Sequence, residues 1–235
     1  MFLTQFDINV ARRDAMRLLA SPERLHAAVL GAFPPGQSVS NGARTLWRLD
    51  RGPARHDARL MIVSPLRPDL TALNEQAGWS NGASSRSANY DPFLQALRSG
   101  STWRFRCTIN PTTAVRKSAG SRGQRVAEVT AEQQLTWFIG RVERHGYTVP
   151  VNDQGAPSAQ VTRREILRFR RQRSTVTLAV TQVDGVIQIQ DADAARLALV
   201  QGIGPAKSYG CGLMTLAPTV RGSTAKPATV SYTHL

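Results

Sequence analysis

The densest group of side chains that could bind a ligand lies between residues 163 and 173. Guanidinium groups pair bidentately with phosphates and stack on bases, and this segment contains six of them against one acid, Glu165: Arg163, Arg164, Arg168, Arg170, Arg171 and Arg173. Strand alternation would put Leu167 and Phe169 on one face and Arg168 and Arg170 on the other, an arrangement suited to a nucleic-acid backbone. The alternative is a solvated edge strand whose charges prevent aggregation.

A glycine-rich segment, residues 202–212, could approach an anion. Its glycines would let backbone amides cradle a phosphate, and two side chains add donors; the residues are Gly202, Gly204, Gly210, Gly212, Lys207 and Ser208. The Gly-Lys-Ser/Thr order of a nucleotide-binding P-loop is absent, and the segment follows an expected helix, which excludes a dinucleotide fingerprint. A structural turn with glycine at the end of a helix explains the composition equally well.

The histidines are the candidates for proton transfer near neutral pH. The chain has four, His26, His56, His145 and His234, and no two stand at metal-ligand spacing. Two cysteines are too few for a four-thiolate zinc site, so we expect no metal. His145 falls at the expected end of a helix, where a cation suits the helix dipole. His26 stands beside the apolar face of an expected helix, and spacing alone interprets it as a surface residue.

The charge balance points to a polyanionic partner. Lys and Arg number 30 against 16 acids, which gives a net charge of +14 and a pI of about 11.3, and nucleic acid is the commonest partner of such a chain. At 41% hydrophobic residues the chain is too apolar to be a disordered basic tail. It lacks an 18-residue apolar run and the pattern of a signal peptide. We expect a cytoplasmic globular protein without membrane contact.

The elements that would position these residues fall into two blocks. In the first, strands are expected over 1–10, 44–50 and 57–63, and a helix begins at Ser21-Pro22. Weaker helical patterns cover 69–77 and 92–97, and the Ser/Asn/Gly/Ala-rich stretch 80–87 indicates a flexible loop.

The second block begins with a strand over 103–109 and a basic loop over 111–125 that carries Arg116 and Lys117. A capping-box pattern, Thr130 to Gln133, starts a helix. Strands at 161–170 and 175–183, a hairpin at Asp184-Gly185, a helix capped by Asp191 and a strand at 213–217 follow.

The β-α-β-β-(β)-α-β order of the second block fits a ferredoxin-like fold, as in RNA-recognition modules. We therefore expect an α+β chain of two tandem ferredoxin-like domains, 1–98 and 99–218. Residues 219–235 lack a hydrophobic period and are expected to form a disordered tail.

Several segments resemble the CasE family of CRISPR-repeat endoribonucleases, which are subunits of the type I-E Cascade complex. These are Met1-Phe2-Leu3-Thr4, the early helix with His26, Trp47-Arg48-Leu49, Arg104-Phe105-Arg106 running into Asn110-Pro111, and the glycine-rich segment 202–213. The glycine-rich segment is the most specific of them. The resemblance covers residues 1–218 in the family's order.

The resemblance implies an antiviral-defence enzyme that cleaves precursor CRISPR RNA within the repeat stem-loop without a metal or cofactor. A 2′-hydroxyl attacks the phosphate, which leaves a 2′,3′-cyclic phosphate and a 5′-hydroxyl, and the mature guide RNA stays bound among other Cascade subunits. The family's principal catalytic histidine corresponds to His26. Some relatives have a catalytic tyrosine three residues earlier, where this chain has Glu23, so Glu23 is not assigned a catalytic role.

The resemblance also assigns RNA binding to the arginines at 163–173, to Arg116 and Lys117, and to Lys207 and Ser208. The alternative function is a non-catalytic RNA-binding subunit of a ribonucleoprotein complex. A basic DNA-binding protein is a third possibility, which would bind duplex DNA as well as hairpin RNA.

Overall fold

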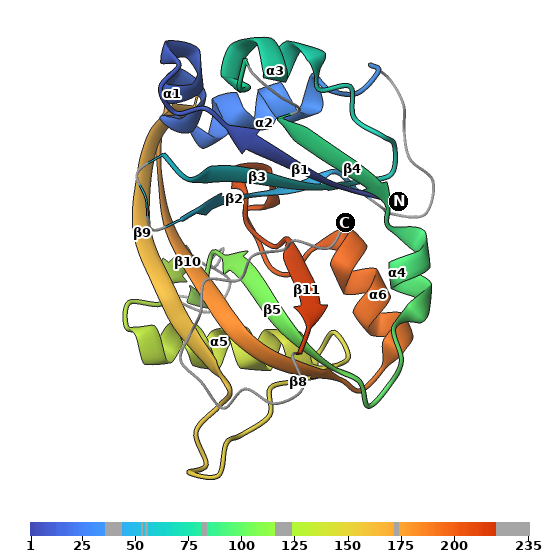
Figure 1. Ribbon diagram of the computed structural model, residues 1–235. Coiled ribbons are helices and arrows are strands. Elements are labelled where there is room, and N and C mark those ends of the chain that lie inside the picture. The colour runs from blue at the N-terminus through green and yellow to red at the C-terminus, as the bar shows by residue number, and fades with distance from the viewer. Residues whose placement is uncertain are drawn as a thin grey trace.

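The computed structural model describes residues 1–35, 44–52, 54, 56–80, 84–115, 124–171 and 174–219. Two antiparallel sheets face each other, with helices on the outer side of each (Figure 1). No helix in the described ranges is long and apolar enough to cross a membrane. The predicted tail at 219–235 lies outside the described residues beyond Thr219, and so do Arg116, Lys117, Arg173 and His234.

The first sheet has the order β2-β3-β1-β4. Its strands are β1 (Phe2–Ile8), β2 (Leu46–Arg51), β3 (Ala58–Ser64) and β4 (Ser85–Asn89). Helices α1 (Arg13–Leu19), α2 (Pro22–Leu30) and α3 (Thr71–Ala77) cover its outer face, and α4 (Asp91–Ala96) leads to the second sheet (Figure 1). Leu25 and Val29 of α2 pack with Phe6 and Leu60 of the sheet in one buried cluster, so apolar periodicity fixes how α2 is turned.

The second sheet has the order β11-β5-β10-β8, and β9 pairs with β10 outside this path. The strands are β5 (Thr102–Ile109), β8 (Tyr147–Thr148), β9 (Ala159–Arg171), β10 (Ser174–Ile189) and β11 (Met214–Pro218). Helices α5 (Ala131–Glu143) and α6 (Ala192–Gln201) pack on it, and the 3₁₀ helix η2 (Lys207–Tyr209) precedes β11. A separate ribbon joins β6 (Thr112–Val115) to β7 (Gln124–Ala127).

Both sheets share one connectivity. In the first unit the strands follow one another along the chain as β1, β2, β3 and β4, and in the second unit as β5, β8, β10 and β11. In each sheet, the strand that comes first in its unit lies between the third and the fourth, and the second strand lies at the edge next to the third. This is the ferredoxin-like arrangement, so the predicted α+β class with two ferredoxin-like units is confirmed. One buried cluster joins the two sheets, because Leu46 and Met61 of the first pack with Phe105 and Leu213 of the second part of the chain.

Most predicted elements appear, and two predicted caps are confirmed. Thr130 and Gln133 form a reciprocal capping box on α5, and the Asp191 carboxylate accepts hydrogen bonds from the N–H groups of Asp193 and Ala194 on α6. Ser21 stands at the N-cap of α2 but makes no side-chain hydrogen bond there. Helix α1 was not predicted from the sequence.

Three predicted segments differ from the structure. The prediction of a hairpin at Asp184-Gly185 is wrong, because β10 continues through both residues. Asp184 forms an ion pair with Arg106 of β5. A Cβ on Gly185 would lie 2.3 Å from the Ser158 carbonyl oxygen, so glycine is needed there for close packing. The predicted loop 80–87 contains the start of β4, an edge strand paired with β1. Its sequence is polar and has no apolar alternation, so the pattern did not indicate a strand. The ends of the predicted loop 111–125 form the β6–β7 ribbon.

Candidate active site and nucleic-acid interface

His26 lies on α2 beside the second strand of the first sheet. Its side chain is half-buried, and the indole N–H of Trp47 donates a hydrogen bond to its Nδ1 at 3.2 Å. The two rings stack with centroids 6.5 Å apart. His26 is therefore held in place by a tertiary contact and is not the freely exposed side chain that spacing alone suggested.

This contact decides where the imidazole carries its proton. Nδ1 can accept a hydrogen bond only when it is unprotonated, so the neutral ring carries its proton on Nε2. Burial lowers the pKa of His26 from its usual value, because it disfavours the charged ring. The lowered pKa and the hydrogen bond from Trp47 both favour the neutral ring with its proton on Nε2.

Trp47 is itself fixed by the glycine-rich segment. Its side chain is only 2% exposed, and Gly210 lies against its ring. Gly210 has φ +81°, and a Cβ at this position would lie 2.6 Å from Cζ3 of Trp47. Both the left-handed backbone and the close approach require glycine here, so the 202–212 segment supports the residue that orients His26.

The other glycines of this segment also face protein atoms. A Cβ on Gly204 would lie 2.8 Å from the Trp137 ring, one on Gly202 would lie 2.9 Å from Leu46, and one on Gly212 would lie 2.8 Å from the Ile203 carbonyl oxygen. Gly202 also ends α6 with φ +76°. These contacts favour the structural-turn explanation over a backbone cradle for phosphate. Lys207, half-buried, and Ser208, exposed, remain available on η2.

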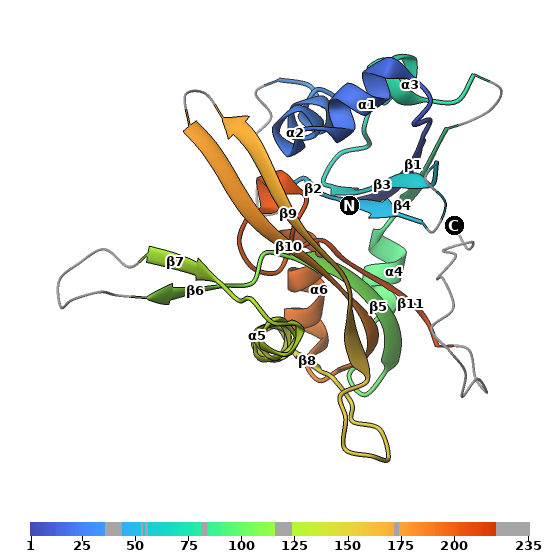
Figure 2. The ribbon, with the colours of Figure 1, turned by 90° about the vertical axis from the view of Figure 1, so that its left-hand side faces the viewer.

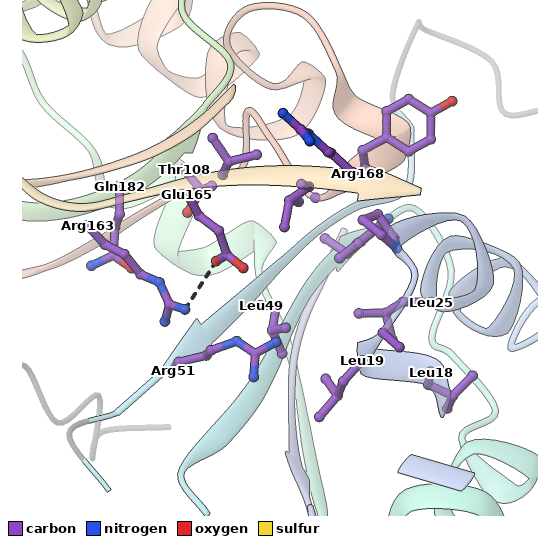
Figure 3. A pocket seen from close by; sticks show the side chains of 17 residues that line it. Leu18, Leu19, Leu25, Leu49, Arg51, Thr108, Arg163, Glu165, Arg168 and Gln182 are labelled. Carbon is purple, nitrogen blue, oxygen red and sulfur yellow. Dashed lines mark hydrogen bonds and ion pairs between the residues drawn. The ribbon is translucent and has the colours of Figure 1, made fainter. Parts of the chain in front are cut away.

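A pocket opens beside Trp47 between α1, α2 and the second sheet (Figure 3). Leucines from the first unit, Leu18, Leu19, Leu25 and Leu49, form one wall. Polar groups of β9 and β10 form the other, where Arg163 donates to Glu165 at 3.1 Å and Gln182 lies beside them (Figure 3). Trp47 and Gly210 reach its edge, so the pocket adjoins the residue that holds His26.

The arginines of 163–171 do not act as one group. Arg163 is paired with Glu165 on the pocket side, and Arg164 donates to the Val129 carbonyl oxygen. Arg168, Arg170 and Arg171 are exposed. The expected alternation holds near the hairpin tip, where Phe169 is buried between exposed arginines. The β9–β10 hairpin and the β6–β7 ribbon project from the same side of the molecule (Figure 2).

The remaining candidates lie apart from this site. His56 is exposed and 3.6 Å from Asp57, and His145 is half-buried after the end of α5. The described residues contain no cluster of three or more potential metal ligands. Cys107 and Cys211 are buried, and burial raises the pKa of Cys107 to about 12, which keeps that thiol protonated.

Sequence reasoning did not assign Trp47 a place in the site. It stands 21 residues from His26 in another element, and no spacing rule connects a helix to a strand across such a distance. The only signal was its place in the motif Trp47-Arg48-Leu49, which identifies a family and gives no contact.

Comparisons with known proteins identify a family and relatives that cover most of the chain. The model of the family described as CRISPR associated protein matches residues 1–218. The chain is 28% identical to the CRISPR-associated endoribonuclease Cse3 of Thermus thermophilus over 225 residues, covering 93% of this chain and 100% of the relative. It is 29% identical over 124 residues to the CRISPR system Cascade subunit CasE of Escherichia coli, covering 48% of this chain and 57% of the relative.

The fold is also similar to a solved structure, that of CRISPR endoribonuclease Cse3 bound to a 19-nucleotide RNA. The TM-score is 0.78 at 27% sequence identity, and the match covers 93% of this chain and 100% of that one.

Proposed function

The chain belongs to the family of CRISPR-associated proteins, and on this basis we propose that it is an endoribonuclease that cleaves precursor CRISPR RNA within the repeat stem-loop. It then retains the guide RNA as a subunit of a type I-E Cascade complex, in the cytoplasm where the transcript is made. A relative aligned over its full length is named an endoribonuclease, and another is named a Cascade subunit. The observation that carries the proposal is the half-buried His26, oriented by Trp47.

The reaction needs an oriented proton donor and no metal. The 2′-hydroxyl upstream of the scissile phosphate loses its proton to water and attacks phosphorus in line, while the bond from phosphorus to the 5′ oxygen breaks. Because Nδ1 of His26 accepts from Trp47, the Nε2–H of the neutral ring donates a hydrogen bond that stabilises the charge developing on the departing 5′ oxygen, and water returns a proton to that oxygen. A donor positioned in this way contributes roughly 10²–10³-fold, and in-line positioning with nearby cations supplies the rest.

The RNA-binding surface extends along the second unit. Arg168, Arg170 and Arg171 contact the repeat stem, and Lys207 and Ser208 lie near its base. Arg116, Lys117 and Arg173 are assigned to the same surface from the sequence. Arg163 and Arg164 bind RNA at the edge of this surface. Residues 1–98 form the domain that carries His26, and 99–218 form the domain that binds the stem.

Replacement of His26 tests the proposal. In His26→Ala, cleavage of a repeat hairpin should fall by roughly 100-fold or more, while its affinity for the RNA stays within about threefold, since binding rests on the arginines. EDTA should leave the wild-type rate unchanged. His56→Ala, the same substitution at an exposed histidine, is the control.

Cutting by His26→Ala at the wild-type rate would show that the catalytic assignment is wrong. A wild-type protein that binds the hairpin and never cuts it would instead be the non-catalytic RNA-binding subunit. Equal affinity for duplex DNA and hairpin RNA would favour the DNA-binding alternative.

A further inference from the structure

Helix α5 presents two basic side chains beside a fixed tryptophan. Trp137, Arg141 and His145 stand four residues apart, which places them along one side of the helix and just past its end. The Arg141 guanidinium carbon lies 4.9 Å from the centroid of the Trp137 ring. The Trp137 indole N–H donates to the Thr112 carbonyl oxygen at 3.1 Å, and Gly204 packs on the ring. Arg141 therefore stands on a rigid platform.

Lys207 adds a third cation from a different part of the chain. A Cβ on Gly202 would lie 3.0 Å from Cε of Lys207, so the lysine stem runs along the glycine-rich segment that also contacts Trp137. Burial, Arg44 and Arg141 lower the pKa of Lys207. Burial, Arg141 and Lys207 likewise lower the pKa of His145. Arg141, His145 and Lys207, here called the α5 cation cluster, are therefore electrostatic neighbours.

The cluster has no carboxylate partner within the described ranges. None of its three side chains forms a hydrogen bond or ion pair there, although each is half-buried. Two other partly buried arginines are paired with carboxylates: Arg106 with Asp184 at 2.8 Å, and Arg59 with Asp7 at 3.0 Å. Further cations, Arg125 and Arg144, act on Arg141. Holding like charges together out of water costs free energy that a bound anion would offset.

The helix dipole explains only part of this arrangement. Arg141 and His145 lie at the C-terminal end of α5, where a cation gains about 0.3–1 kcal/mol. Lys207 belongs to η2, and Arg44 precedes β2, so neither is a residue of the helix that the dipole would select. The cations come from three segments: the end of α5, η2 and the stretch before β2. Interaction with the α5 dipole accounts only for the cations at the end of α5.

We propose that the α5 cation cluster binds a phosphate group of the RNA backbone, away from the bond that is cut. The inference rests on the proposed function. The glycine-rich segment links the two places: Gly204 contacts the Trp137 platform, and Gly210 contacts Trp47, which holds His26. One RNA strand that passes over η2 would meet His26 on one side of this segment and the cluster on the other. The ligand chemistry is a tetrahedral phosphate oxyanion, which free phosphate shares.

The variant Arg141→Gln tests the site by binding. The RNA is a repeat hairpin with a 2′-deoxy residue at the cut site, so that binding is measured without cleavage. We expect the dissociation constant to rise roughly five- to tenfold near 0.1 M salt, and the slope of log K against log salt to fall by about one. Arg141→Lys should keep the wild-type slope because it keeps the charge. Arg67→Gln, at an exposed arginine of the first unit, is the matched control.

Neutral methylphosphonates placed one at a time along the hairpin identify the partner. One position should weaken binding to the wild-type protein and have no further effect on Arg141→Gln. Inorganic phosphate at matched ionic strength should not displace the RNA, and displacement would assign the site to free phosphate and overturn the proposal. It is also overturned if Arg141→Gln binds like Arg67→Gln, or if no position shows the coupling.

These outcomes are separate from the proposed function. Cleavage of an all-ribose hairpin by the wild-type protein tests the endoribonuclease alone. If the wild-type protein cuts this RNA and Arg141→Gln binds it as the wild-type protein does, the proposed endoribonuclease function stands and the proposed phosphate site is wrong.

Discussion

At the scale of single residues, the chemistry of His26 depends on a side chain from another element. The Trp47 N–H donates to Nδ1 at 3.2 Å, and the Gly210 backbone packs against the indole ring. A histidine whose Nδ1 is occupied can exchange a proton with RNA only through Nε2. The orientation of the ring is thus built into the fold before RNA binds.

The variant Trp47→Phe should raise the pKa of His26. Phenylalanine keeps a ring against Gly210 but removes the donor that only the neutral imidazole can accept, so the neutral form loses stability relative to the protonated one. An NMR titration of the imidazole signals measures the shift, and cleavage of the hairpin should slow. Trp103→Phe, which loses a similar bond to the Ser101 hydroxyl, is the control. An unchanged His26 titration in Trp47→Phe would show that the hydrogen bond is unimportant.

His26 and Trp47 also mark the limit of sequence reasoning at this scale. The resemblance to the family indicated His26 as the catalytic residue, whereas its position relative to the apolar residues of the helix indicated an ordinary surface residue. The contact with Trp47 arises only when α2 packs on the first sheet, since the residues are 21 positions apart in different elements.

At the scale of elements, the arginines of β9 are all exposed but differ in their ion pairs. Arg163 is paired with Glu165 at 3.1 Å, whereas Arg168, Arg170 and Arg171 form no ion pair within the described residues. Arginines of this second group can exchange counterions for RNA phosphates without first breaking an internal ion pair.

Replacing Arg168, Arg170 and Arg171 together by glutamine should weaken RNA binding strongly. The slope of log K against log salt should fall by about three, and the unfolding free energy should stay within roughly 1.5 kcal/mol, since each site is exposed. Arg163→Gln should change the slope less. Equal slopes for the triple variant and the wild-type protein would place the RNA elsewhere.

The sequence predicted both strands of this hairpin but not how far β10 extends. Asp184-Gly185 is typical of a tight turn, yet here the aspartate pairs with Arg106 and the glycine admits the Ser158 backbone. A glycine needed for close approach has the same sequence signature as a glycine needed for a turn, so pattern alone cannot separate them.

At the scale of the whole molecule, a buried arginine joins the two sheets. Arg48 of β2 forms two hydrogen bonds with the Asp50 carboxylate, at 2.7 and 2.9 Å. It also donates to the carbonyl oxygens of Arg106 and Leu213 and to the Thr215 hydroxyl. His26 lies on the first unit and the exposed arginines on the second, so this junction sets their separation.

The variant Arg48→Met should therefore destabilise the protein. It leaves the Asp50 carboxylate buried, with Arg106 4.0 Å away, and loss of one member of a buried pair typically costs about 3–5 kcal/mol. Urea unfolding measures the change. Arg59→Met, which breaks the more exposed pair with Asp7, should cost about 0–1 kcal/mol. Similar losses for the two variants would show that the junction is not a major support of the fold.

The chemistry of the cut ends tests the central claim most directly. Wild-type protein is incubated in EDTA with a repeat hairpin, and with the same hairpin carrying a single 2′-deoxy residue upstream of the cut. Mass spectrometry should find a 2′,3′-cyclic phosphate and a 5′-hydroxyl on the products of the first RNA, and no cleavage of the second. A 3′-hydroxyl with a 5′-phosphate, or cleavage of the 2′-deoxy hairpin at the same site, would contradict attack by the 2′-hydroxyl and the role assigned to His26.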